Sequence, residues 1–122
     1  MTLPATPHLE AQLQHDIDQL RTKILEMAAL DEKALTRALQ SFLNRDRHLA
    51  YSVILRDQYV DELETELDQL CLTFILRHQP AASHLRFVYS ASNVVHELER
   101  IGDYAESIGR QALQFSSMDL EI

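Results

Sequence analysis

Apolar residues recur every three or four positions along almost the whole chain, the spacing of helices that bury one face. The first stretch covers about residues 8–44, with Leu9, Leu13, Ile17, Leu20, Ile24, Met27, Ala28, Leu35, Leu39 and Phe42. The second covers about 47–77, with Val53, Val60, Leu63, Leu67, Leu70, Cys71 and Phe74. The third runs from about 81–83 to 115, with Leu85, Phe87, Val88, Val94, Val95, Leu98, Ile101, Ala105, Ile108 and Ala112. The pattern predicts three long helices and an all-α fold.

Two short breaks separate the predicted helices. Asn44-Arg45-Asp46 interrupts the first stretch, and Asp46 is of a residue type that caps helix N-termini. Pro80 ends the second stretch, because the residue before a proline is pushed out of helical geometry. Connections this short make consecutive helices run in opposite directions. We therefore predict an antiparallel up-down-up three-helix bundle with long helices.

The ends of the chain differ from its middle. We expect a disordered lead over residues 1–7, a single three-helix domain over residues 8–116 and a tail over residues 117–122. The tail carries Met118, Leu120 and Ile122, apolar residues that further chain or a partner would cover.

Composition narrows the class of protein. A chain of 122 residues with two Gly and three Pro has few turns and buries one modest core. A net charge of −8 argues against a nucleic-acid groove, which needs clustered Lys and Arg. We expect a cytoplasmic protein without membrane insertion, because no leader and no membrane-spanning apolar run is evident. Cys71, the single cysteine, lies on an apolar stripe and is expected to be a packed core thiol.

Acidic residues four positions apart occur on both the second and the third predicted helix. Like charges at this spacing cost a helix a few tenths of a kcal/mol, and hard carboxylate oxygens are cation ligands. If the two helices are neighbours, Asp57 and Asp61 face Glu99 and Asp103 across one seam, which makes these four the candidate metal ligands. The alternative is chance, since 19 acidic residues generate such pairs and nearby arginines neutralise them.

Other chemical motifs are incomplete. His96-Glu97-Leu98-Glu99-Arg100 begins like a zinc-protease helix, but an arginine stands where the second histidine is required. No Glu-x-x-His occurs, which removes the signature of di-iron carboxylate bundles. His96 lies beside the acidic residues, either as a ligand or as a surface ion-pairing group. Gly102 allows either close helix packing or room for ions above Glu99 and Asp103.

Three segments resemble the PhoU family of phosphate-signalling regulators. Residues 98–109, Leu-Glu-Arg-Ile-Gly-Asp-Tyr-Ala-Glu-Ser-Ile-Gly, resemble its third-helix signature. Residues 80–86 are similar to the turn into that helix, and residues 57–64, Asp-Gln-Tyr-Val-Asp-Glu-Leu-Glu, to the acidic motif of the second helix. Order and separation agree, so the resemblance covers about residues 8–116.

The resemblance implies three-helix units whose paired acidic motifs bind multinuclear clusters, commonly of iron or zinc. Carried over by position, the ligands are Asp57, Asp61, Glu99 and Asp103. It also implies a regulator that restrains phosphate-starvation signalling by contacting a sensor histidine kinase and the ATPase of a phosphate transporter. Two departures stand out: His84 replaces the usual Asp of the turn, and one repeat is present where two are usual.

We therefore predict a non-enzymatic cytoplasmic regulator of phosphate uptake that acts through contacts of its long helix faces, carries divalent or ferric ions and forms a homo-oligomer. A metal-free helical interaction or dimerisation module is the alternative. A carboxylate-bridged metalloenzyme is the rival from another class, and the missing Glu-x-x-His counts against it.

Overall fold

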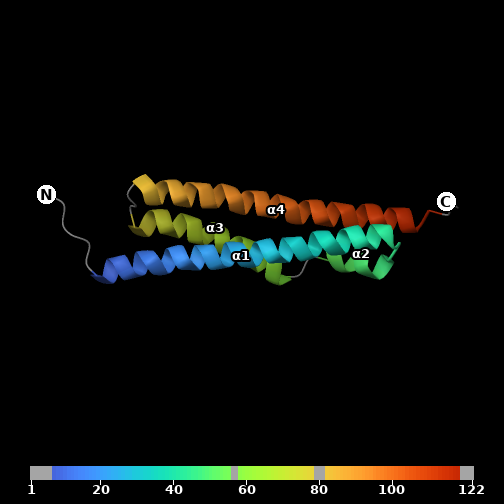
Figure 1. Ribbon diagram of the computed structural model, residues 1–122, viewed down its shortest axis with the longest axis horizontal. Coiled ribbons are helices and arrows are strands. Elements are labelled where there is room, and N and C mark those ends of the chain that lie inside the picture. The colour runs from blue at the N-terminus through green and yellow to red at the C-terminus, as the bar shows by residue number, and fades with distance from the viewer. Residues whose placement is uncertain (1–6, 56–57, 79–81, 119–122) are drawn as a thin grey trace.

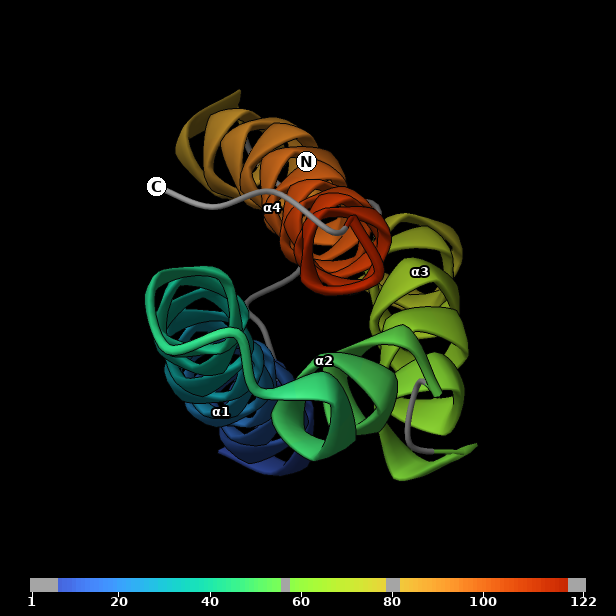
Figure 2. The ribbon, with the colours of Figure 1, turned by 90° about the vertical axis from the view of Figure 1, so that its right-hand side faces the viewer.

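The computed structural model describes residues 7–55, 58–78 and 82–118, and these form a long helical bundle (Figure 1). The helices are α1 (Pro7–Leu43), α2 (Arg47–Ile54), α3 (Gln58–His78) and α4 (Ala82–Ser116). Helices α1 and α4 run the length of the bundle, and α2 and α3 follow one another along its third side (Figures 1 and 2). The predicted antiparallel up-down-up bundle is confirmed. Residues 1–6 of the expected lead and residues 119–122 of the expected tail lie outside the described residues, whereas Pro7, the last residue of the expected lead, begins α1.

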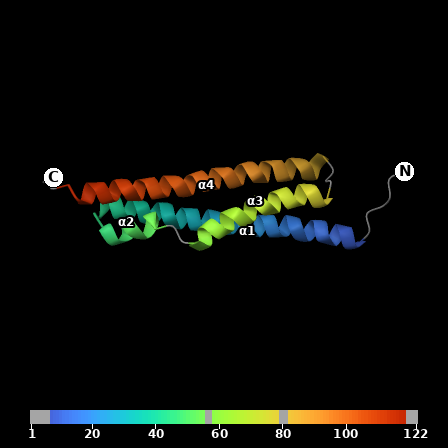
Figure 3. The same ribbon diagram turned by 180° about the vertical axis from the view of Figure 1, so that it is seen from behind.

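The second predicted helix is divided into two, which the sequence pattern does not indicate. The division falls at Leu55, whose φ of −76° and ψ of 81° are not helical. On one continuous helix at 100° per residue, the buried positions of α2 and those of α3 would point about 75° apart. The interruption lets Val53 on α2 and Leu63 on α3 both face the core, and Figure 3 shows the change of direction between the two helices.

Two buried clusters hold the bundle together. The larger joins α1, α3 and α4 through Ile17, Leu20, Met27, Leu63, Leu67, Cys71, Phe74, Val88 and Val95. The smaller joins α1, α2 and α4 through Ala38, Val53 and Ala105. The small side chains of this cluster let α2 lie close to α4. Gly109 on α4 shows how close: a Cβ added there would lie 3.3 Å from Ile54 Cγ1 and 3.4 Å from Ala50 O. The division of the middle segment thus gives each half of the bundle its own core.

Side chains stabilise the connection between α1 and α2. Asp46 accepts a hydrogen bond from the Leu49 backbone N–H at 3.1 Å, as its position at the predicted break requires. Arg45 adopts a φ of 52°, and its guanidinium donates to the carbonyl of Met118 at 2.8 Å. The same group lies 4.9 Å from the ring centre of Phe115. These contacts fasten the end of α4 to the turn between α1 and α2.

Several stripe positions predicted to face inward are instead exposed. Leu39, Leu85 and Val94 each leave two fifths or more of their surface uncovered. Cys71, by contrast, is buried as predicted. A three-helix bundle covers only part of each helix, so the outer edges of a wide apolar stripe remain at the surface. None of the described helices is long and apolar enough to cross a membrane.

Candidate functional site

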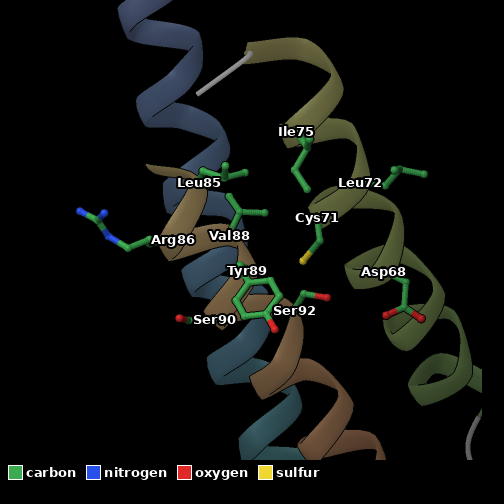
Figure 4. Close-up of a pocket in the computed structure, with 10 residues that line it drawn as sticks. All are labelled: Asp68, Cys71, Leu72, Ile75, Leu85, Arg86, Val88, Tyr89, Ser90 and Ser92. Atoms are coloured by element: carbon green, nitrogen blue, oxygen red, sulfur yellow. The ribbon is translucent and has the colours of Figure 1, made fainter. Parts of the chain in front are cut away.

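A groove of about 700 Å³ lies between α3 and the first half of α4 (Figure 4). Its lining is mostly apolar and consists of Asp68, Cys71, Leu72, Ile75, Leu85, Arg86, Val88, Tyr89, Ser90 and Ser92. Leu72 is 58% exposed and Tyr89 68% exposed, so large apolar side chains on both walls meet solvent. Contiguous apolar surface of this kind makes the groove a candidate site for binding another molecule.

The floor of the groove carries the only thiol of the chain. Cys71 is buried, and burial raises the pKa of its thiol above the ordinary value, with the charge of Asp68 adding to the effect. A protonated thiol is a poor nucleophile and a poor metal ligand. Cys71 therefore acts here as an apolar packing group.

Asp68, at one end of the groove, also lies close to a histidine and a second carboxylate. Asp68 on α3 and His96 and Glu99 on α4 each place one ligand atom within 4.8 Å of the other two. Asp68 and His96 are exposed, whereas Glu99 is half-buried. Across the described residues, this is the group of three or more His, Cys, Asp or Glu side chains that meets this distance.

The four predicted metal ligands are distributed differently. Asp57 lies outside the described residues. Asp61 and Asp103 are exposed, and Glu99 is half-buried with its Oε1 atom buried. Asp61 lines a surface hollow to which only α3 contributes, with Gln58, Glu62, Thr65, Glu66 and Gln69. Within the described part of the chain, Glu99 alone of the predicted set belongs to a convergent group, so the four-carboxylate site stays a prediction.

Two further acidic side chains have a buried carboxylate oxygen. Asp31 on α1 is 3% exposed, and its Oδ2 atom is buried, as is Oε1 of Glu64 on α3. Asp31 also lines a small cavity of about 130 Å³ that Gly102 borders from α4. The sequence carried a signal for Asp31, which lies four residues from Met27 and from Leu35 on the apolar stripe of α1. An acidic residue at that position interrupts the apolar pattern, but its side chain lies on the same helix face and therefore points toward the core.

A second polar cluster ties the far end of α1 to α3. Asp16 accepts hydrogen bonds from Arg77 Nη1 at 3.1 Å and Gln12 Nε2 at 3.0 Å, and lies 2.5 Å from His78 Nε2. Burial alone would raise the pKa of Asp16, but the hydrogen bonds from His78 and Gln12 and the charge of Arg77 outweigh it and hold the pKa below its ordinary value. The cluster is a structural clamp between two helices.

Comparison with known proteins gives one family. The sequence profile of the PhoU domain matches residues 24–112. The phosphate-specific transport system accessory protein PhoU of Serratia marcescens is 39% identical over 107 residues, which are 88% of this chain and 44% of that protein. The protein of the same name from Escherichia coli is 36% identical over 113 residues, 93% of this chain and 47% of that protein.

The fold agrees with the sequence comparison. The crystal structure of PhoU from Pseudomonas aeruginosa superposes with a TM-score of 0.80 at 35% sequence identity, over 84% of this chain and 49% of that one. The chain thus spans just under half the length of the curated relatives and of the solved structure that it matches.

Proposed function

This chain belongs to the PhoU family, and from that premise we propose that it is a non-enzymatic cytoplasmic regulator of phosphate uptake and of phosphate-starvation signalling. The observation that carries the proposal is the match of the family profile over residues 24–112, together with relatives named as accessory proteins of phosphate-specific transport. The proposed partners are a sensor histidine kinase and the ATPase of a phosphate transporter.

The apolar groove between α3 and α4 is the proposed contact surface. Tyr89 is of a residue type that is enriched among the side chains that dominate binding energy at protein interfaces, and Leu72 and Ile75 add large exposed apolar surface beside it. Arg86 on one wall and Asp68 on the other provide opposite charges beside this apolar surface, which would fix the orientation of a partner. Regulation in this proposal requires contact and no bond-breaking chemistry by the chain itself.

Binding measurements with the purified kinase and transporter ATPase of the source organism test the proposal. Glu in place of Leu72 or Tyr89 puts a charge on the apolar wall and should weaken binding by about 10- to 30-fold, the effect of losing a hot-spot residue. Leu25→Glu is the matched control, because Leu25 is 71% exposed on α1, away from the groove lining. Equal binding of all three variants and the unmodified chain would remove the groove as the contact surface, and absence of binding to either protein would refute the proposed partners.

Metal binding is the second part of the proposal. The family resemblance implies iron or zinc ions at Asp57, Asp61, Glu99 and Asp103. Asp57 lies outside the described residues, so the structure does not test the set, and the regulatory proposal above uses no step that passes through a bound ion. Metal analysis of protein purified without chelator, compared with Asp57→Asn and Glu99→Gln, tests the site. Equal trace metal in all three preparations would contradict it.

Self-association completes the proposal. Family members usually carry two three-helix repeats, and this chain spans just under half the length of its relatives. We propose that two copies of this three-helix unit pair. Sedimentation of the 14.1 kDa chain should give a dimer mass, whereas a monomer at micromolar concentrations would contradict pairing. A dimer that binds neither kinase nor ATPase would instead favour a plain dimerisation module.

A further inference from the structure

The two walls of the groove between α3 and α4 change from apolar to acidic in the same direction. On α4, positions that recur every three or four residues share one face of the helix. From the start of α4, this face carries Leu85, Tyr89, Ser92, His96, Glu99 and Asp103. The groove-facing side of α3, followed in the same spatial direction because the two helices are antiparallel, carries Ile75, Leu72, Asp68 and Asp61. The seam between the helices is therefore apolar beside their connection and acidic further along.

The acidic part of the seam begins where the apolar part ends. Asp68 lines the apolar groove, and one of its carboxylate oxygens lies within 4.8 Å of one from Glu99 across the seam. Asp68 is exposed, as are Leu72 and Tyr89, so another molecule can reach both parts at once. Figure 4 shows Ile75 of α3 and Tyr89 of α4 on the two sides of this open surface.

The form of the groove favours a helix as its occupant. Both walls are helices whose backbone groups are bonded internally, so an extended peptide would find no strand edge to pair with. A small ligand is mostly enclosed by its site, whereas both walls here are open to solvent. A helix satisfies its own backbone and packs against two others at interaxial distances of about 8–10 Å. At about 1.5 Å per residue, the seam from Leu85 to Asp103 is about 27 Å long, which fits a helix of about 18 residues.

We propose that this seam binds an amphipathic helix of a partner protein that carries apolar and basic residues on one face. The apolar half of that face packs on Leu72, Ile75 and Tyr89, and its lysines or arginines lie beside Asp68 and Glu99. Burial of apolar surface supplies binding energy, and the pairing of opposite charges fixes the direction in which the helix lies. The inference rests on the proposed function in taking the groove as the contact surface, and it adds the chemistry of the partner segment.

Binding of synthetic 18-residue peptides to the full chain, followed by fluorescence anisotropy, tests this chemistry. The probe is an alanine-based helix with leucines on one face of one half and lysines on the same face of the other half. It should bind at least about 10-fold more tightly than a peptide of the same composition whose leucines and lysines share no face, and salt should weaken its binding. A proline at its centre breaks the helix and should weaken binding by at least about 10-fold. Undiminished binding of either altered peptide would overturn the proposal.

Variants of the chain locate the contact. Asp68→Lys should weaken binding of the lysine peptide by about fivefold or more and should strengthen binding of a peptide with glutamates in place of the lysines. Asp18→Lys is the matched control, because it changes the net charge equally but lies exposed on α1, outside the groove lining. Leu72→Gln should weaken binding of both peptides by about fivefold or more, whereas Leu25→Gln on α1 should not. Equal effects within either pair of variants would overturn the seam as the binding site.

Failure of this inference can be distinguished from failure of the regulatory proposal. The peptide measurements use neither the kinase nor the ATPase, so absence of peptide binding overturns the helical partner segment alone. If the kinase or the ATPase binds the chain and Asp68→Lys leaves that binding unchanged, the basic helix is again overturned while the regulatory proposal stands. The regulatory proposal itself fails if neither protein binds the chain.

Discussion

Removing the charge of Asp16 should destabilise the chain in a way that depends on pH. Asp16 is almost fully buried and is held by Arg77, His78 and Gln12, which link α1 to α3. A hydrogen bond to a charged group contributes about 1.5–3 kcal/mol, but the Arg77 side chain is about half exposed and solvent weakens its share. Asn keeps the shape and one acceptor of Asp. We therefore expect Asp16→Asn to lower the free energy of unfolding at pH 7 by about 1.5–3 kcal/mol.

The pH dependence follows from the direction of the pKa shift. The pKa of Asp16 is lower in the folded chain than in the unfolded chain, so the unfolded state takes up the proton first as the pH falls. The stabilisation is complete above about pH 5 and is lost as the pH falls below about 4 through the folded-state pKa. The difference between the unmodified chain and Asp16→Asn should accordingly shrink as the pH falls below about 4.

Urea unfolding followed by far-ultraviolet circular dichroism measures both effects. Asp18→Asn is the matched control, because Asp18 is an exposed neighbour on α1 that accepts a hydrogen bond from Gln14, on the same helix, at 2.9 Å. Its effect should stay within about 0.5 kcal/mol. The reasoning would be refuted if Asp16→Asn and Asp18→Asn lowered the free energy of unfolding equally. It would also be refuted if the difference between Asp16→Asn and the unmodified chain did not narrow in acid.

Three further outcomes test the packing. Phe74→Ala should lower the free energy of unfolding by about 3–5 kcal/mol, because Phe74 is 1% exposed in the larger core; a loss below about 1 kcal/mol in urea would contradict that core. Gly109→Leu should cost about 1–3 kcal/mol and raise amide exchange in α2, because the new side chain meets Ile54 and the Ala50 carbonyl; unchanged exchange would contradict the close approach of α2 and α4. The Cys71 thiol should react with a thiol reagent far more slowly in the folded chain than in urea, because it is buried and its pKa is raised; equal rates would contradict its burial.

The periodicity of apolar residues was sufficient to predict the bundle, and it failed to indicate the structure only at particular positions. The ends of α1 and α4, the Asp46 cap and the buried positions of α3 follow from stripe spacing and residue type. The interruption at Leu55 does not follow from them, because neither glycine nor proline occurs there. It results from the angle between the buried face of α2 and the buried face of α3. In the sequence, Asp31 is visible only as an acidic residue that interrupts the apolar stripe of α1, and its burial is known from the structure.

The predicted metal site, unlike the fold, is not tested by the structure, because Asp57 lies outside the described residues. Spacing along one helix identifies acidic pairs, but it does not give the register of one antiparallel helix against another. That register places Asp68 beside Glu99 and His96, and it also brings Asp16 to Arg77 and His78. Pairings between residues 28 or more positions apart thus come from tertiary packing.

The regulatory role is tested most directly in cells that lack this protein. With phosphate in excess, such cells should express a phosphate-starvation reporter, and the unmodified chain should return the reporter to its repressed level. The Leu25→Glu variant should repress equally well, whereas Leu72→Glu and Tyr89→Glu should leave the reporter on. A reporter that stays unaffected by the presence of the chain would contradict the proposed function.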